Sequence, residues 1–252
     1  MANLNTIVAY LDDYLDIDRF QDYAPNGLQV EGRPEVRFVM GGVTASRALV
    51  EAAVREGADA LLVHHGYFWR GGDPRVRGIM RERLKLLLSS DISLIAYHLP
   101  LDAHPDVGNN RQLGELLEIE ITGPLDSGGD LTRGLHGRFP EPLAPDRARA
   151  LLTRRLGREP LHIAGGDGPI RTIGWCTGAA QGFLELAVDK HLDAYVSGEI
   201  SERTVHLAIE SGTHYFSAGH HATERYGVQA LGAHLADKFG LRFGFEEIPN
   251  PV

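Results

Sequence analysis

The sequence is organised around the stretch Leu61-Leu62-Val63-His64-His65-Gly66-Tyr67-Phe68-Trp69. Its aliphatic residues are typical of the end of a buried strand, and two histidines follow where that strand should stop. In open α/β sheets, ligands bind beyond the carboxyl ends of the strands, and neutral imidazoles are suitable metal ligands. Because neighbouring side chains of a strand point to opposite faces, two interpretations are open. Either the strand breaks at His64, or the two histidines serve two metals a short distance apart.

The composition is that of an ordinary globular protein. The chain has 252 residues, of which 43% are hydrophobic and 23% charged, enough for one large domain or two small ones. Its formal net charge of -9 argues against general nucleic-acid binding, which needs Lys and Arg to neutralise phosphates. Cys176 is the only cysteine, so an intrachain disulfide is excluded and a reducing compartment fits. No apolar run is long enough to span a membrane and no basic-then-apolar leader follows Met1, so we expect a cytoplasmic protein.

Hydrophobic periodicity predicts an α/β fold in which strands and helices alternate. A strand over 36–43, a helix that begins after Ser46 and ends at Glu56, and a strand over 60–63 form one strand-helix-strand unit. Such a unit implies parallel strands and a right-handed crossover. Further helices are expected over 4–15, 80–88, from Asn109 or Asn110 to 117, 145–156, 183–191, 201–210 and 222–239, and further strands over 93–97, 173–176, 194–197, 214–217 and 241–248.

Two segments of the chain resemble each other, which suggests an internal repeat. The segment 43–66 resembles 176–200, and Asp59-Ala60-Leu61-Leu62 matches Asp193-Ala194-Tyr195-Val196 at an offset of 193 − 59 = 134 residues. Two related α/β halves would explain the match; chance similarity between two amphipathic units is the alternative. Where the first copy carries His64-His65, the second carries Gly198-Glu199, so we expect one metal site per chain.

The domain boundary is expected in a segment of different composition. Residues 124–143 are rich in Gly, Pro and Asp, which is typical of a loop. We expect a first α/β domain made of 1–124 plus 221–252, which carries most metal ligands, and a second made of 125–220. The predicted architecture is therefore two similar, interlinked α/β domains with mostly parallel sheets flanked by helices.

Two further polar clusters follow predicted strands. In Gly219-His220-His221-Ala222-Thr223-Glu224, His220 and Glu224 are four residues apart and share one face of a helix. Asp102 lies just past the strand 93–97. Capping and helix-dipole roles would also explain these residues singly. Together, the five candidate ligands suit two divalent ions such as Zn, Mn, Fe or Co about 3.5–4 Å apart, with Glu224 as the bridge; they are His64, His65, Asp102, His220 and Glu224.

Three residues are weaker candidates for a supporting role. His98 either orients a ligand or transfers a proton, or it is structural. Glu199 has the same candidate catalytic role or is only the acid at a helix start, and His221 belongs with them. The aromatic residues Tyr67, Phe68 and Trp69 either stack on a planar ligand or pack in the core.

Five segments together resemble one family, the GTP cyclohydrolase I type 2 homologues, also called NGG-interacting-factor-three-like dinuclear-metal proteins, in their short bacterial form. They are Asp22-Tyr23-Ala24-Pro25-Asn26-Gly27-Leu28-Gln29-Val30, Val63-His64-His65-Gly66, His98-Leu99-Pro100-Leu101-Asp102, Ser197-Gly198-Glu199 and Ala218-Gly219-His220-His221-Ala222-Thr223-Glu224. The resemblance implies two similar α/β domains and a toroidal homohexamer whose metals face its cavity. It also implies two metal ions per subunit, held by the five candidate ligands.

Two functions are compatible with these residues. The first is a dinuclear-metal-dependent hydrolase, in which a metal-activated water attacks a purine nucleotide, opens its ring and releases formate, or attacks a related small substrate. The second is a non-enzymatic hexameric scaffold or regulatory protein that binds metal. In either case we expect neither membrane nor general nucleic-acid partners.

Overall fold

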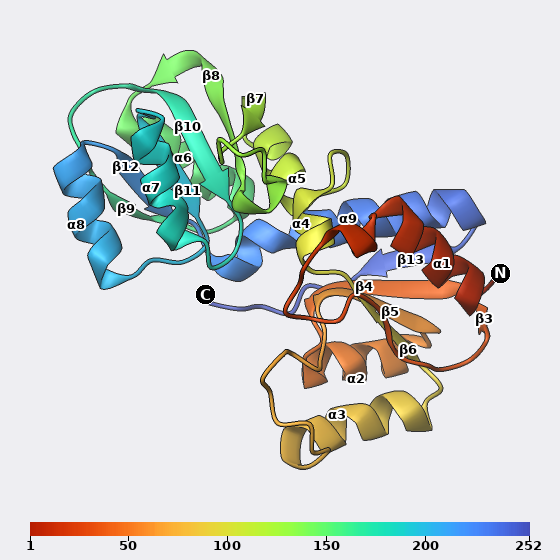
Figure 1. Ribbon diagram of the computed structural model, residues 1–252. Helices are drawn as coiled ribbons and strands as arrows, with labels where there is room; N and C mark the ends of the chain where they lie inside the picture. The colour runs from red at the N-terminus through yellow and green to blue at the C-terminus, as the bar shows by residue number, and fades with distance from the viewer. The chain divides into compact units, whose positions relative to one another are not determined.

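The computed structural model describes residues 1–252 and divides the chain into two compact units (Figure 1). Unit 1 comprises Met1–Leu101 and Gly227–Pro249, and unit 2 comprises Asp102–Tyr226 and Asn250–Val252. The chain leaves unit 1 after Leu101 and returns to it at Gly227. The first domain predicted from the sequence, 1–124 plus 221–252, has other bounds than unit 1, because 102–124, 221–226 and 250–252 belong to unit 2.

Unit 1 is built on a five-stranded sheet of order β13-β4-β5-β6-β2. The four strands β13, β4, β5 and β6 are parallel neighbours, and only β2 is antiparallel. This sheet confirms the expected mostly parallel architecture and the strand-helix-strand unit. The strands are β2 (Gly27–Val30), β4 (Phe38–Thr44), β5 (Ala60–His65), β6 (Ser93–Ala96) and β13 (Arg242–Phe245).

Helices cover both faces of this sheet (Figure 1). They are α1 (Leu4–Tyr14), α2 (Arg47–Glu56), α3 (Gly78–Ser89) and the part of α9 (His220–Phe239) that belongs to unit 1. Two adjacent glycines of β4 show how closely they pack. A Cβ on Gly42 would lie 2.4 Å from Leu49 of α2, whereas a Cβ on Gly41 would lie 3.1 Å from Val228 of α9. The strand β4 is therefore enclosed on both faces.

The predicted ends of α2 are confirmed. The Ser46 hydroxyl accepts a hydrogen bond from the backbone N–H of Leu49, which satisfies one free donor of the first turn. Gly57 follows the helix with φ 70°, a left-handed conformation that glycine adopts without a Cβ penalty. Capping and periodicity together fix this helix locally, which is why the sequence predicts it well.

Unit 2 has a six-stranded sheet of order β7-β8-β10-β11-β12-β9. Only β10, β11 and β12 are parallel neighbours, and the outer strands pair antiparallel, so this sheet is mixed. The strands are β7 (Glu120–Pro124), β8 (Leu135–Leu143), β9 (Leu161–Ile163), β10 (Ile170–Cys176), β11 (Ala194–Ser197) and β12 (His214–Ser217).

The loop predicted over 124–143 is wrong for its second half, which forms β8. This strand pairs with β7 on one side and β10 on the other, so its backbone groups are satisfied in spite of its Gly and Pro content. Gly137 permits the close pairing, because a Cβ there would lie 2.4 Å from the Glu120 carbonyl oxygen. The pairing of β7 with β8 also explains why 120–124 belongs to unit 2.

The helices of unit 2 again lie on both faces (Figure 1). On one face, α5 (Asn109–Leu116) and α6 (Pro145–Leu156) pack with Trp175, Val196 and Phe216. On the other, α7 (Leu184–Asp189) and α8 (Glu202–Ser211) pack with Tyr195 and Tyr215.

The smaller elements are β1 (Ala2–Asn3) paired with β3 (Glu35–Val36), α4 (Leu99–Ala103), and the 3-10 turns Ile17–Arg19, Leu131–Arg133 and Gln181–Phe183. None of the helices combines the length and the apolar character needed to cross a bilayer.

Candidate metal centre

Three histidines of unit 1, here called the imidazole set, gather at the carboxyl ends of two parallel strands. They are His64 and His65 of β5 and His98, which follows β6. One ring nitrogen from each lies within 4.8 Å of the others. The strand continues through His65, so the alternative in which it breaks at His64 is excluded. His64 is only 1% exposed, and a buried imidazole needs hydrogen-bonding or ligand partners for its nitrogens.

Hydrogen bonds fix the tautomer of two of these rings. Nδ1 of His64 lies 2.9 Å from the Tyr97 carbonyl oxygen, which can only accept, so Nδ1 carries the proton. Nδ1 of His98 likewise donates to the Asp22 carboxylate at 2.9 Å. In the neutral form of either ring, the proton on Nδ1 leaves the lone pair on Nε2, which is the arrangement that orients histidine as a metal ligand or a base. Nδ1 of His65 lies 3.0 Å from the Thr44 hydroxyl, which can donate or accept.

Asp22 and Asn26 hold the chain at His98. Asp22 accepts hydrogen bonds from the backbone N–H of Leu99 and the side-chain amide of Asn26, while Asn26 accepts from the backbone N–H of His98. Burial acts to raise the pKa of Asp22, but the hydrogen bond and charge of His98, with the Asn26 and Leu99 donors, outweigh it and lower this pKa to about 2. In the sequence, Asp22 and Asn26 stood out only as part of the family-like segment 22–30, so these supporting roles were missed.

Two buried carboxylates lie close together within unit 2. Asp102 is 8% exposed and Glu224 is 3% exposed, and an oxygen of each lies within 4.8 Å of the other. The Asp102 carboxylate accepts from the Asn109 amide at 2.9 Å and the Thr177 hydroxyl at 3.4 Å. Two buried like charges at this separation disfavour each other, and a proton or a cation relieves the repulsion. The donor types therefore fit a hard or borderline divalent cation.

His220 lies against Glu224 at the start of α9. Its Nε2 is 3.0 Å from Glu224 Oε2, and its Nδ1 is 2.7 Å from Glu199 Oε1. Burial acts to lower the pKa of His220, but Glu224 and then Glu199 raise it to about 9 in the metal-free protein. The structure thus places Glu199 where a carboxylate orients a ligand histidine through its second nitrogen. His221 instead donates its backbone N–H to the Val252 carbonyl oxygen.

Gly198 allows the chain to close around the start of α9. A Cβ on Gly198 would lie 2.6 Å from the Gly178 carbonyl oxygen and 2.6 Å from His220 Cα. Gly198 also donates its backbone N–H to Gly178 at 2.9 Å. Only glycine fits between these two backbones, so the residue before Glu199 is part of how His220 is positioned.

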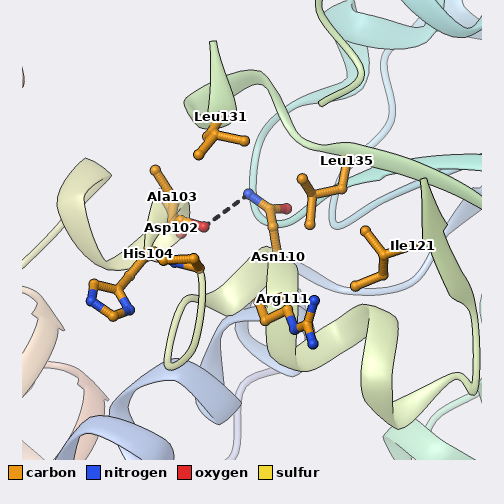
Figure 2. A pocket seen from close by; sticks show the side chains of 9 residues that line it. Asp102, Ala103, His104, Asn110, Arg111, Ile121, Leu131 and Leu135 are labelled. Atoms are coloured by element: carbon orange, nitrogen blue, oxygen red, sulfur yellow. Dashed lines mark hydrogen bonds between the residues drawn. The ribbon is translucent and has the colours of Figure 1, made fainter. Parts of the chain in front are cut away.

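A cavity of about 120 Å³ borders Asp102 within unit 2 (Figure 2). Its walls come mainly from apolar side chains such as Ile121, Leu131 and Leu135. The Asn110 amide donates to the Asp102 carbonyl oxygen at 3.2 Å beside it. Since small-molecule sites usually have volumes of about 300–1,000 Å³, this cavity is too small for a nucleotide.

The fold is α/β, and its His, Asp and Glu side chains form groups that could hold a metal ion. A family model described as Duf34/NIF3 (NGG1p interacting factor 3) matches residues 2–251, and the chain belongs to this family. The resemblance noted in the sequence is thereby confirmed.

Relatives and solved structures agree with this assignment. The chain is 54% identical over 249 residues to the GTP cyclohydrolase 1 type 2 homolog of Pseudomonas aeruginosa, covering 99% of this chain and 98% of the relative. It is 47% identical over 247 residues to the protein of the same name from Escherichia coli, covering 96% of each. A solved structure described as protein ybgI, of unknown function, matches with TM-score 0.95 at 44% identity, and TTHA1606 from Thermus thermophilus matches with TM-score 0.90 at 38% identity; both comparisons cover 100% of both chains.

Proposed function

We propose that the protein is a dinuclear-metal-dependent hydrolase. The five ligands predicted from the sequence, His64, His65, Asp102, His220 and Glu224, would hold two divalent ions in one centre. The observation that carries the proposal is the pair of buried carboxylates, Asp102 and Glu224, whose oxygens lie within 4.8 Å of each other. Burying two such charges without a compensating cation is unfavourable, whereas a divalent ion turns them into ligands.

The histidines complete a suitable donor set. Imidazole and carboxylate together suit Zn, Mn, Fe or Co. The Tyr97 carbonyl keeps Nε2 of His64 unprotonated, and Glu199 holds His220 by its Nδ1. When bound, two such ions supply a water that ionises near neutral pH and polarise a substrate oxygen.

His98 is suited to move a proton. Its Nδ1–H is held by Asp22, so Nε2 is free to accept a proton from a reacting group and return it. The supported substrate class is a purine nucleotide whose ring is opened with release of formate, or a related small substrate. This choice rests on the relatives named GTP cyclohydrolase 1 type 2 homolog.

The direct test is formate release from GTP by protein loaded with Zn, Mn or Fe. We expect turnover by the natural protein and a loss of about a thousandfold or more in Glu224→Ala, because removing an essential ligand removes the ion's contribution. His206→Ala is the matched control, because this exposed histidine pairs only with Glu202 in the same helix. Absence of turnover with all three metals, in protein that retains two ions, would contradict the hydrolase and favour the metal-binding scaffold.

We also propose that the chain forms a homohexamer, as the family resemblance implies. Native mass spectrometry should then give a species of six times the 27.6 kDa chain mass. A monomer or dimer at micromolar concentration would contradict this assembly.

A further inference from the structure

Two aromatic side chains form a wall beside the imidazole set. This aromatic wall consists of Tyr23 and Trp69, whose ring centroids are 5.7 Å apart with planes tilted by 34°. The plane of the His98 ring is steeply inclined to both, at 72° to Tyr23 with centroids 4.9 Å apart and at 82° to Trp69 with centroids 5.2 Å apart. Trp69 also lies 5.9 Å from the His65 ring. All these residues belong to unit 1.

The wall is held in place by backbone contacts. Arg70 donates its backbone N–H to the Tyr23 carbonyl oxygen at 2.8 Å, and its guanidinium donates to the Asp22 carbonyl oxygen at 2.9 Å. Phe68, directly before Trp69, has φ 63°, a left-handed conformation that is rare and costly for a bulky residue. Strain of this kind persists where the surroundings enforce it, and it clusters at functional sites.

The wall is not part of the core. Tyr67, the first of the three aromatic residues after the histidines, is 2% exposed and donates its hydroxyl to the Ala45 carbonyl, so it packs as expected of a core residue. Tyr23, in contrast, is 53% exposed, and Trp69 is half-buried. A large aromatic surface kept accessible beside basic nitrogens is suited to a ligand that is flat and partly apolar.

We infer that the aromatic wall binds the planar heteroaromatic ring of the substrate by stacking. This inference rests on the proposed function and extends it by assigning the residues that recognise the substrate's ring. Because the centroid of the His98 ring lies 4.9 Å from that of Tyr23 and 5.2 Å from that of Trp69, a ring stacked on the wall lies beside the imidazole set. Stacking favours any flat heterocycle and discriminates weakly among bases. The wall therefore selects a nucleobase-like ring over a non-aromatic compound, while other contacts select the base.

Calorimetric titration of the metal-loaded protein with guanosine, and with ribose as the non-aromatic comparison, tests this assignment. We expect guanosine to bind, ribose not to bind, and Trp69→Leu and Tyr23→Leu each to weaken guanosine binding about tenfold to a hundredfold. Trp69→Phe and Tyr23→Phe keep a stacking face and should weaken it less than fivefold. Tyr14→Leu is the matched control, because Tyr14 is a partly exposed tyrosine of the same unit that stacks on His234 instead.

Tryptophan fluorescence gives a second measurement that needs no substitution. Trp175 is fully buried, so quenching by acrylamide reports on Trp69, and bound guanosine should protect it. Unchanged quenching, or unchanged guanosine affinity in Trp69→Leu with a native circular dichroism spectrum, would overturn the inference. The readout is binding, so it is separable from the hydrolase proposal: formate release with an unaltered KM in Trp69→Leu contradicts only the wall, whereas wall-dependent binding without turnover contradicts only the hydrolase.

Discussion

The end of β5 and the end of β11 occupy equivalent places in the two units but carry different residues. Ala60 of β5 pairs with Val39, and Ala194 of β11 pairs with Ile173, so both members of the pair are displaced by the same 134 residues. Beyond this shared frame, β5 continues as His64-His65, whereas β11 ends at Ser197 and is followed by Gly198-Glu199.

The difference shows that the same strand-helix-strand unit can either carry the histidines itself or position a histidine from another element. The first copy presents imidazoles from the strand itself. The second presents none, but Gly198 makes room for the start of α9, and Glu199 holds His220, which comes from that helix. In the first copy, the histidines belong to the repeated segment itself. In the second copy, the repeated segment positions His220, which lies outside it.

The largest loss of stability is expected on substituting Gly198, because this glycine stands where the first copy carries His64. Gly198→Ala should destabilise unit 2 by about 3 kcal/mol, because overpacking against rigid backbone on two sides cannot relax easily. Gly57→Ala is the control, since a Cβ there has no atom within 4 Å and only the left-handed backbone opposes it. Urea unfolding measures both. Equal, small losses would show that Gly198 is not a close-approach position.

The shared frame predicts equal effects at two aspartates. Asp59 accepts from the backbone N–H groups of Arg37 and Phe38, and Asp193 accepts from those of Arg171 and Thr172. Replacing either by alanine leaves two backbone donors without their acceptor, so we expect a loss of about 2 kcal/mol in the free energy of unfolding in each case. A loss in only one of the two variants would break the structural equivalence of the repeats.

A smaller loss in the free energy of unfolding is expected at acid pH, and it comes from Asp22 in unit 1. The pKa of Asp22 is about 2 in the folded protein against an ordinary value of 3.8, so its contribution is complete above the unfolded value and is lost as the pH falls toward 2. Between roughly pH 5 and pH 2 the metal-free protein should lose about 1–2 kcal/mol through this group. In Asp22→Asn this part of the pH dependence should disappear from urea titrations. An unchanged slope would show that Asp22 is not held as described.

The elements that sequence alone predicted are those fixed by local signals. Ser46 caps the start of α2, and Gly57, in a left-handed conformation, ends it. Short apolar runs located the parallel strands. The imidazole set also followed from such signals, because parallel strands bring their carboxyl ends to one edge.

The features that sequence missed depend on pairing between distant segments. The strand β8 is rich in Gly and Pro and becomes a strand only because two neighbours pair with it. The roles of Asp22 and Asn26 likewise require the loop after α1 to reach the end of β6, which no local pattern encodes. Glu199 was only a weak candidate because its partner His220 is 21 residues away.

Metal analysis of protein purified without chelators and reloaded with Zn or Mn tests the central claim most directly. The claim predicts two ions per chain in the natural protein and in His206→Ala, and at most one in His64→Ala and in Glu224→Ala. Two ions per chain in Glu224→Ala, or none in the natural protein after reloading, would contradict it.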